Sequence, residues 1–178
     1  VFVSGSRPYC RTGGEWAVES ASVPFAVADV WGSGPSDQWV VGATGRAAHW
    51  DGTAWTSVDT GTTRGLSAVW GSGASDVWAA GSEGAILHWD GGSWTDAAAA
   101  EPGSEQWNIR GLWGTGPSEV WGAGVISSTN QGLICRFDGG AWSVAYLSTS
   151  VPDPWTAIWG HDSSDIWVVG FLGTIVHW

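Results

Sequence analysis

Two kinds of side chain that can bind a metal or move a proton recur at fixed places in this sequence. A Ser-Asp or Ser-Glu pair stands two residues before a tryptophan at 36–37, 75–76, 118–119 and 164–165. A histidine precedes a later tryptophan at His49, His88 and His177, and Arg136 takes that place in the remaining copy. A ring of carboxylates could bind a metal, and histidine could serve as a ligand or a base.

A structural interpretation of these residues is favoured because every copy repeats them equally. A short acidic side chain in a turn accepts backbone N–H bonds. Histidines that stand one repeat apart are too distant from one another to share one metal ion. We therefore predict no metal site and no cofactor.

The remaining composition limits the classes of function. The chain has 178 residues, 17 acidic side chains, six arginines and no lysine, which gives a net charge of −11. Binding to nucleic acid or to an anionic membrane needs clustered cations, so neither is predicted. The apolar stretch from Ile166 is too short to span a bilayer. A phosphate loop, a nucleophile elbow and a sialidase-type set around Tyr9 or Tyr146 are all missing, so we predict that the chain is not an enzyme.

The elements that position these residues are repeated. A Trp-Gly pair begins each unit at Trp31, Trp70, Trp113 and Trp159, at intervals of roughly 40 to 46 residues. Of the 17 tryptophans, all but Trp107 and Trp155 fall on four repeated positions. So many large rings favour packing over ligand binding for most of them.

Each unit contains four short apolar runs separated by Gly, Asp and Ser turns, and no helical period. In the best-formed unit the runs are 66–70, 77–80, 85–89 and a run that starts at Trp94. This spacing is typical of a β-propeller blade with four antiparallel strands. The fold class is therefore predicted as all-β, with three complete blades at about 27–60, 66–98 and 109–147.

Two incomplete blades are expected at about 1–20 and 155–178. The Trp-Gly strand is expected to be the inner one. The first blade then lacks its inner strand and the last lacks its outer strand. We therefore expect the chain to be a piece of a longer propeller, or to pack against a partner that supplies the missing edges.

Known propeller families share parts of this pattern. Asp-Gly-x-x-Trp at Asp51, Asp90 and Asp138 partly matches the Asp-box. The stretches 77–81 and 86–91, followed by Trp94, resemble tectonin-type propeller repeats more closely, and kelch repeats less so. The tectonin resemblance implies a propeller fold and recognition of a glycan or a surface, and no binding residue of that family is carried over.

Function is expected where the repeat fails, because repeated positions hold the fold. Trp107 is off-register in a polar loop and could stack on a sugar or dock a partner, or it could fold over the blade instead. Trp155 aligns with Leu66 and is expected in the core. The candidate ligand-binding residues lie in loops expected on one face of the disc: Arg46, Arg64, Gln106, Trp107, Asn108, Arg110, Asn130 and Gln131.

The hypothesis that follows is a non-catalytic recognition or scaffold module that binds a glycan or a protein partner. The first alternative is a structural subunit of a larger extracellular assembly, and the second is a non-catalytic part of a propeller glycoside hydrolase. Composition favours a secreted or cell-surface bacterial protein, with the periplasm as the alternative setting. Cys10 and Cys135 could form a disulfide or be two small buried side chains.

Overall fold

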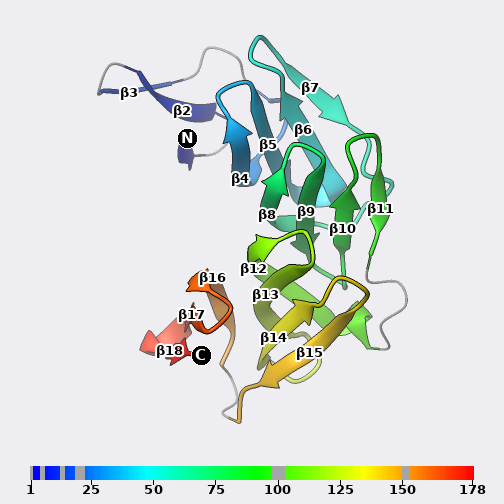
Figure 1. The fold of residues 1–178 in the computed structure, drawn as a ribbon, viewed down its shortest axis with the longest axis vertical. Coiled ribbons are helices and arrows are strands. Elements are labelled where there is room, and N and C mark those ends of the chain that lie inside the picture. Colours follow the sequence, from blue (N-terminus) through cyan, green and yellow to red (C-terminus); the bar gives the residue numbers. More distant parts are fainter. Residues whose placement is uncertain (1, 5–6, 13–14, 19–22, 98–102, 150–152) are drawn as a thin grey trace.

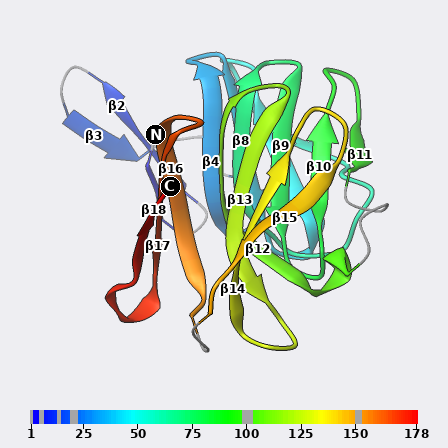
Figure 2. The same cartoon turned by 60° about the horizontal axis from the view of Figure 1, so that its bottom comes forward.

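The protein forms a row of five antiparallel sheets that follow one another in chain order. The computed structural model describes residues 2–4, 7–12, 15–18, 23–97, 103–149 and 153–178. Figure 1 shows the sheets arranged in an arc, and Figure 2 shows the three central sheets standing side by side. Among the described residues, no helix is long and apolar enough to cross a membrane.

Three of the sheets have four strands, each paired with its sequence neighbour. The first is β4 (Val27–Gly34), β5 (Asp37–Gly42), β6 (Arg46–Trp50) and β7 (Trp55–Val58). The second is β8 (Leu66–Gly73), β9 (Asp76–Gly81), β10 (Ile86–Trp89) and β11 (Trp94–Asp96). The third is β12 (Trp107–Gly116), β13 (Glu119–Ile126), β14 (Gln131–Phe137) and β15 (Trp142–Leu147).

The two outer sheets have three strands each within the described residues. The N-terminal sheet is β1 (Phe2–Ser4), β2 (Arg7–Thr12) and β3 (Glu15–Val18). The C-terminal sheet is β16 (Trp155–Asp162), β17 (Asp165–Gly170) and β18 (Ile175–His177). Short 3-10 turns at Ala43–Gly45, Ser104–Gln106 and Phe171–Gly173 lie in the loops. The predicted fold class, with three complete and two incomplete blades, is confirmed.

The strands that carry the Trp-Gly pair lie next to one another along the inside of the arc. Strand β4 contacts β8, β8 contacts β12, and β12 contacts β16. In each of these strands, the tryptophan stands directly opposite the second tryptophan of its unit, as Trp31 does with Trp39. A β-bulge follows each Trp-Gly pair and turns one extra residue out of the ladder.

Most of the described core lies between neighbouring sheets, and a smaller cluster of Val23, Val40 and Ala48 lies on the first complete sheet. Trp39, Val41 and Ala47 of one sheet are buried together with Leu66 and Leu87 of the next. Two equivalent clusters join the following pairs of sheets. Trp94 and Trp39 pack edge to face with ring centroids 5.2 Å apart, and Trp142 and Trp78 do so at 5.5 Å. Stability therefore comes mainly from contacts between neighbouring units, as in other repeat proteins.

One contact recurs at every described junction between inner strands. We call it the Trp-over-Gly contact. If Gly71 carried a Cβ atom, that atom would lie 2.7 Å from Cη2 of Trp31 in the preceding sheet. A Cβ on Gly114 would lie at the same distance from Cη2 of Trp70, and a Cβ on Gly160 at the same distance from Cη2 of Trp113. The indole thus occupies the space of a side chain. A backbone oxygen of the second strand lies 2.5–2.9 Å from the same Cβ position, so both contacts exclude any residue but glycine.

We predict that Gly71→Ala destabilises the protein and that Gly73→Ala does not. A Cβ at Gly71 would also lie 2.7 Å from the backbone oxygen of Asp76, whereas nothing lies within 4 Å of a Cβ at Gly73. Overpacking of this kind costs about 1–3 kcal/mol, and substitution at an open surface position stays within about 0.5 kcal/mol. Urea denaturation of both variants measures the difference, and equal midpoints would contradict the contact.

Candidate functional site

The repeated histidines and carboxylates form one pair in each of three sheets. Histidine Nε2 lies 2.7 Å from carboxylate Oδ1 in His49–Asp37 and in His88–Asp76, and 2.9 Å from it in His177–Asp165. Each carboxylate is therefore within hydrogen-bond distance of the histidine in its own unit. This contact can hold the histidine ring in place on the sheet. Among the described residues, no group of three or more His, Cys, Asp or Glu side chains is arranged to hold a metal ion.

A hydroxyl from the bulge of the inner strand completes the unit in the three complete blades. Ser33 and Ser72 donate to Asp37 and Asp76, and Thr115 Oγ1 lies 2.7 Å from Oε2 of Glu119. The role of these carboxylates is structural, as expected, but the expected partner was different. The carboxylate contacts a hydroxyl and a histidine. From the sequence we had expected it to accept from backbone N–H groups.

The third complete blade replaces both members of the pair together. Nη2 of Arg136 lies 2.8 Å from Oε1 of Glu119. The guanidinium also sits over the Trp121 ring at 5.2 Å, where the other blades place an imidazole beside the equivalent tryptophan, as His49 does with Trp39 at 4.6 Å. The same junction is thus made by an arginine in place of the histidine and by a longer carboxylate.

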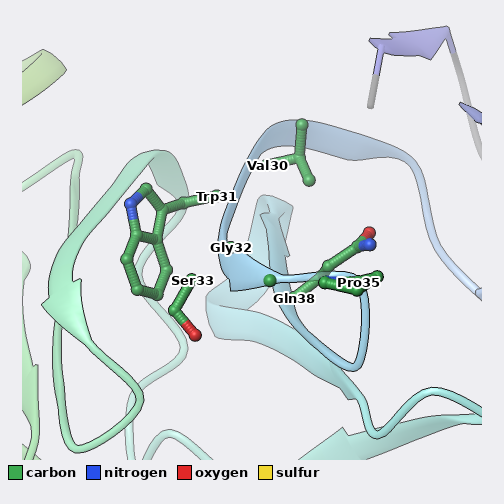
Figure 3. A pocket seen from close by; sticks show the side chains of 7 residues that line it. Val30, Trp31, Gly32, Ser33, Pro35 and Gln38 are labelled. Carbon is green, nitrogen blue, oxygen red and sulfur yellow. The ribbon is translucent and has the colours of Figure 1, made fainter. Parts of the chain in front are cut away.

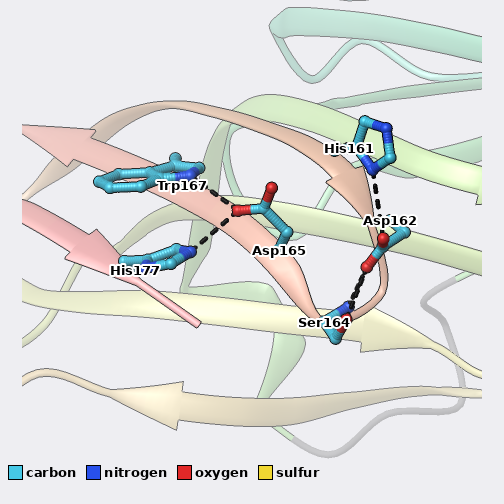
Figure 4. Close-up of polar contacts among 6 residues, drawn as sticks. All are labelled: His161, Asp162, Ser164, Asp165, Trp167 and His177. Carbon is cyan, nitrogen blue, oxygen red and sulfur yellow. Dashed lines mark hydrogen bonds and ion pairs between the residues drawn. The ribbon is translucent and has the colours of Figure 1, made fainter.

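The C-terminal sheet departs from this arrangement. His161 stands where the other blades have the hydroxyl, and its Nδ1 lies 3.2 Å from Oδ2 of Asp162 and not against Asp165 (Figure 4). Asp165 accepts from Nε1 of Trp167 at 2.9 Å and lies beside His177, as Asp76 does with Trp78 and His88. This unit is also more exposed than its equivalents.

In each Asp-Gly turn, the aspartate carboxylate accepts hydrogen bonds from backbone N–H groups of the same turn, and its negative charge strengthens these bonds. Oδ1 of Asp51 accepts from the backbone N–H of Thr53 at 2.8 Å and of Ala54 at 2.9 Å. The Thr53 hydroxyl and these N–H groups lower the pKa of Asp51 to about 2. Backbone N–H groups likewise lower the pKa of Asp90 and Asp138. Gly52, Gly91 and Gly139 follow with φ of +96°, +97° and +92°, so this turn requires glycine.

The loops predicted to share one face do so. The backbone N–H of Gly84 donates to Trp107 O at 2.8 Å, Ser127 N to Gln106 O at 2.8 Å, and Phe171 N to Pro154 O at 3.2 Å. Each of these bonds joins a loop between the second and third strands to a segment that crosses between sheets. The loop face is thus tied together by backbone hydrogen bonds.

Four predicted binding residues use their side chains within this face. Nη1 of Arg64 donates to Glu83 O at 3.2 Å, and its Nη2 pairs with Asp96. Oδ1 of Asn108 accepts from Glu83 N at 3.0 Å. Gln106 accepts from Ser128, and Nε2 of Gln131 donates to Ser148 O at 2.6 Å. These contacts fix the loops, and they account for polar residues that the sequence had suggested for a ligand.

Trp107 is not an exposed platform, and that expectation is corrected. Its side chain is 2 % exposed and packs with Trp78, Ile86 and Ile109. It begins β12, where its backbone oxygen holds the neighbouring loop, so the interpretation as a packed tryptophan is the right one. Trp155 is fully buried, as its alignment with Leu66 predicts.

Three predicted residues remain exposed to solvent on the loops and at a bulge. Arg46 borders a shallow cavity of about 190 Å³, which Phe25, Thr44 and Asp59 also line. Arg110 occupies a bulge of β12, and its guanidinium lies 5.6 Å from the centre of the Phe171 ring. Asn130 has a φ of +56° in the loop before β14. The structure does not bring these three into one site.

Cys135 is a free thiol in the core, with Sγ 3.6 Å from Gly122 O. Burial raises the pKa of this thiol, which disfavours the reactive thiolate. The side chain of Cys10 lies outside the described residues.

One group of exposed apolar side chains on the C-terminal sheet was not among the predicted site residues. We call it the terminal apolar face; it consists of Trp159, Trp167, Val169 and Ile175 on the C-terminal sheet, which are 61, 42, 40 and 64 % exposed. The positions equivalent to Trp167 are 1–4 % exposed: Trp39, Trp78 and Trp121. Those equivalent to Ile175 are at most 3 % exposed: Ala47, Ile86 and Ile134. The sequence gives no signal for this face, because Trp159 and Trp167 follow the same repeat as their equivalents in the other sheets.

Comparison with known proteins finds similarity in fold only. No family model matches the chain, and neither does any curated protein. It is similar to YCF48 from Cyanidioschyzon merolae, with 16 % identity and a TM-score of 0.72 over 99 % of this chain and 64 % of that one. A structure of YCF48 bound to D1 peptide aligns with 16 % identity and a TM-score of 0.67 over 93 % of this chain and 55 % of that one.

The WD40 β-propeller domain of Doa1 is also similar, at 10 % identity and a TM-score of 0.71 over 97 % of this chain and 56 % of that one. The chain has the β-propeller fold. It spans between 55 and 64 % of the length of these three proteins. The resemblance to tectonin-type repeats stays a prediction from sequence.

We predict that Asp51→Asn weakens the pH dependence of stability between about pH 4 and pH 2. The pKa of Asp51 is lowered on folding to about 2, so its charge stabilises the native state above the unfolded pKa. That contribution is lost as the pH falls through about 2. Asparagine keeps the acceptor oxygen without the charge. Thermal melts from pH 5 to pH 2 measure the effect, and a slope equal to that of the wild type would contradict it.

Proposed function

We propose that this chain is a non-catalytic β-propeller module that binds a protein partner through the terminal apolar face. The exposure of this face carries the proposal. Three equivalent faces in the same chain are covered by a neighbouring sheet, whereas this one presents two tryptophans and two aliphatic side chains to solvent. Contiguous apolar surface of this kind is typical of protein-binding sites.

Tryptophan suits this use because its large ring buries much area at a small entropic cost, and tryptophans are common among the residues that dominate binding energy. The fold supports the same class of partner, since one solved propeller of similar structure, YCF48, is bound to a peptide. In three sheets the repeated histidine pairs with a carboxylate of its own unit, which favours a scaffold over a catalyst.

Two finer proposals concern other ligands and the setting. A glycan would use Phe171, which is 53 % exposed, with Arg110 beside it, because the buried Trp107 does not offer a platform. A structural subunit of a larger extracellular assembly would use the terminal apolar face as the contact between subunits. For both we propose a secreted or cell-surface location, which the lysine-free composition supports.

We predict that Trp159→Asp together with Ile175→Asp removes partner binding. The carboxylates would be buried without a counter-charge in the complex, while the free protein keeps its stability because both positions are exposed. The test is affinity capture from an extract of the encoding organism, quantified by mass spectrometry against the wild type. The matched control is Val144→Asp, which changes an exposed valine on β15 in the same way.

The expected result is a protein that the wild type and Val144→Asp retain and the double variant loses. Equal retention by all three would overturn the assignment of this face. The variants Arg110→Ala and Phe171→Ala, assayed with the same partner and on a glycan array, test the loop face. If only Arg110→Ala and Phe171→Ala lost binding, the binding site would lie on the loop face and not on the terminal apolar face.

A further inference from the structure

The loop face of the first complete sheet has a cavity at the place where an ion pair closes the second complete sheet. In the second sheet, Nη1 of Arg64 donates to Glu83 O at 3.2 Å, and its Nη2 pairs with Asp96. The guanidinium thus reaches from the loop to the outer strand. The equivalent positions of the first complete sheet all line a cavity of about 190 Å³: Phe25, Thr44 and Ser57.

Two sequence differences within the repeat leave this space open. Phe25 and Arg64 each stand six residues before the tryptophan of a Trp-Gly pair. Ser57 and Asp96 each stand two residues after the tryptophan that begins an outer strand. A phenylalanine ring and a short hydroxyl cannot form the ion pair that joins Arg64 to Asp96. The third complete sheet has Trp107 at the position of Phe25, and that ring is buried.

Two charged side chains border the cavity without pairing. Arg46 and Asp59 both line it, and both are exposed. Neither takes part in a salt bridge among the described residues. Oδ1 of Asp59 accepts from the backbone N–H of Gly61 at 2.9 Å. In the second sheet the position of Arg46 is taken by Ala85, which is fully buried, so the loop does not need an arginine to form.

The larger cavity beside Gly32 has a different chemistry (Figure 3). Its volume is about 280 Å³, and its described lining has no charged side chain. The side chain of Gln38 lies against Gly32, with Cγ 2.9 Å from the place where a Cβ of that glycine would stand. A guanidinium and a carboxylate therefore distinguish the smaller cavity from this one.

The groups around the smaller cavity fit a neutral molecule with several hydroxyls. The guanidinium of Arg46 donates, the carboxylate of Asp59 accepts, and the hydroxyls of Thr44 and Ser57 can do either. An anion would face Asp59 in the same cavity, and a cation would face Arg46. The half-buried ring of Phe25 adds an apolar wall. The volume is below the roughly 300–1,000 Å³ typical of drug-sized ligands, which suits a single small ring.

We propose that this cavity binds one pyranose unit of a neutral carbohydrate. Arg46 and Asp59 would hold adjacent hydroxyls of the sugar, because together they supply the donors and the acceptor that such a pair needs. The apolar face of the sugar ring would lie against Phe25.

This site is separate from the terminal apolar face and from Phe171, which belong to the C-terminal sheet and its loop. It goes beyond the proposed protein partner. Failure of either binding test therefore leaves the other unaffected.

The test titrates the ¹⁵N-labelled 178-residue chain with the methyl glycosides of glucose, mannose and galactose. The readouts are the side-chain Nε–H resonance of Arg46 and the backbone amide of Gly45. At least one glycoside should shift both resonances to saturation, with a Kd of about 1–10 mM for a single small ring. The absence of saturable shifts below about 50 mM for all three would overturn the proposal. Shifts that only sodium phosphate or sodium acetate produces would assign an anion site and overturn it as well.

Arg46→Ala tests the guanidinium. It should weaken glycoside binding about tenfold, because a charged hydrogen-bond donor to the sugar is lost. The matched control Glu105→Ala removes an exposed charge from the same loop face and should leave the Kd within about twofold. Equal affinity of Arg46→Ala and the wild type would contradict the proposal.

A variant that closes the cavity tests the position of the site. Phe25→Arg together with Ser57→Asp copies the Arg64–Asp96 pair of the second sheet into the first. It should show no saturable binding below about 50 mM. A folded double variant that binds the glycoside with the wild-type Kd would place the sugar elsewhere and overturn the assignment. The titration of the wild type does not depend on the folding of either variant.

Discussion

The packing of a tryptophan ring onto a glycine of the next inner strand is the constraint on which the arc of sheets depends. Any side chain at Gly71, Gly114 or Gly160 would overlap the ring from the preceding sheet. Because interiors are close-packed and rings are rigid, this contact fixes how near two inner strands can come. Three such contacts in succession place four inner strands side by side, and the outer strands follow by antiparallel pairing.

A second, polar arrangement holds each sheet together. A bulge after the Trp-Gly pair points a hydroxyl at a carboxylate, which also meets the histidine of the third strand. In the third complete blade, Glu119 and Arg136 make the same junction with longer side chains. These two positions need one hydrogen-bond acceptor and one donor whose combined side-chain lengths span the gap between the strands. They do not need particular residue types. A mostly enclosed pair with satisfied hydrogen bonds also favours one register over others.

The architecture was predictable from the sequence because period and composition repeat together. Short strands with Gly and Asp turns, and tryptophans in fixed places, leave few alternatives to a propeller. The candidate site was less predictable, because a loop tryptophan looks the same in sequence whether it points inward or outward. Trp107 is in the core, and Arg64 and Asn108 bond to the Glu83 backbone, because loops that share a face satisfy one another's polar groups.

The surface that carries the proposed function lies on the C-terminal sheet, where a repeated contact lacks one of its members. Trp159 is exposed and has no glycine to cover among the described residues. It is not unusual in sequence, since it follows the repeat. Its exposure depends on which sheets stand next to it, which is information that only the fold provides.

The central claim is that Trp31, Trp70 and Trp113 pack on a glycine of the next sheet, whereas Trp159 is exposed to solvent. The most direct measurement is ¹⁹F NMR of protein labelled with 5-fluorotryptophan, assigned by single Trp→Phe variants and recorded in H₂O and D₂O. A solvent isotope shift close to that of free fluorotryptophan is predicted for Trp159, with much smaller shifts for Trp31, Trp70 and Trp113. A shift for Trp159 as small as those of the other three would contradict the claim.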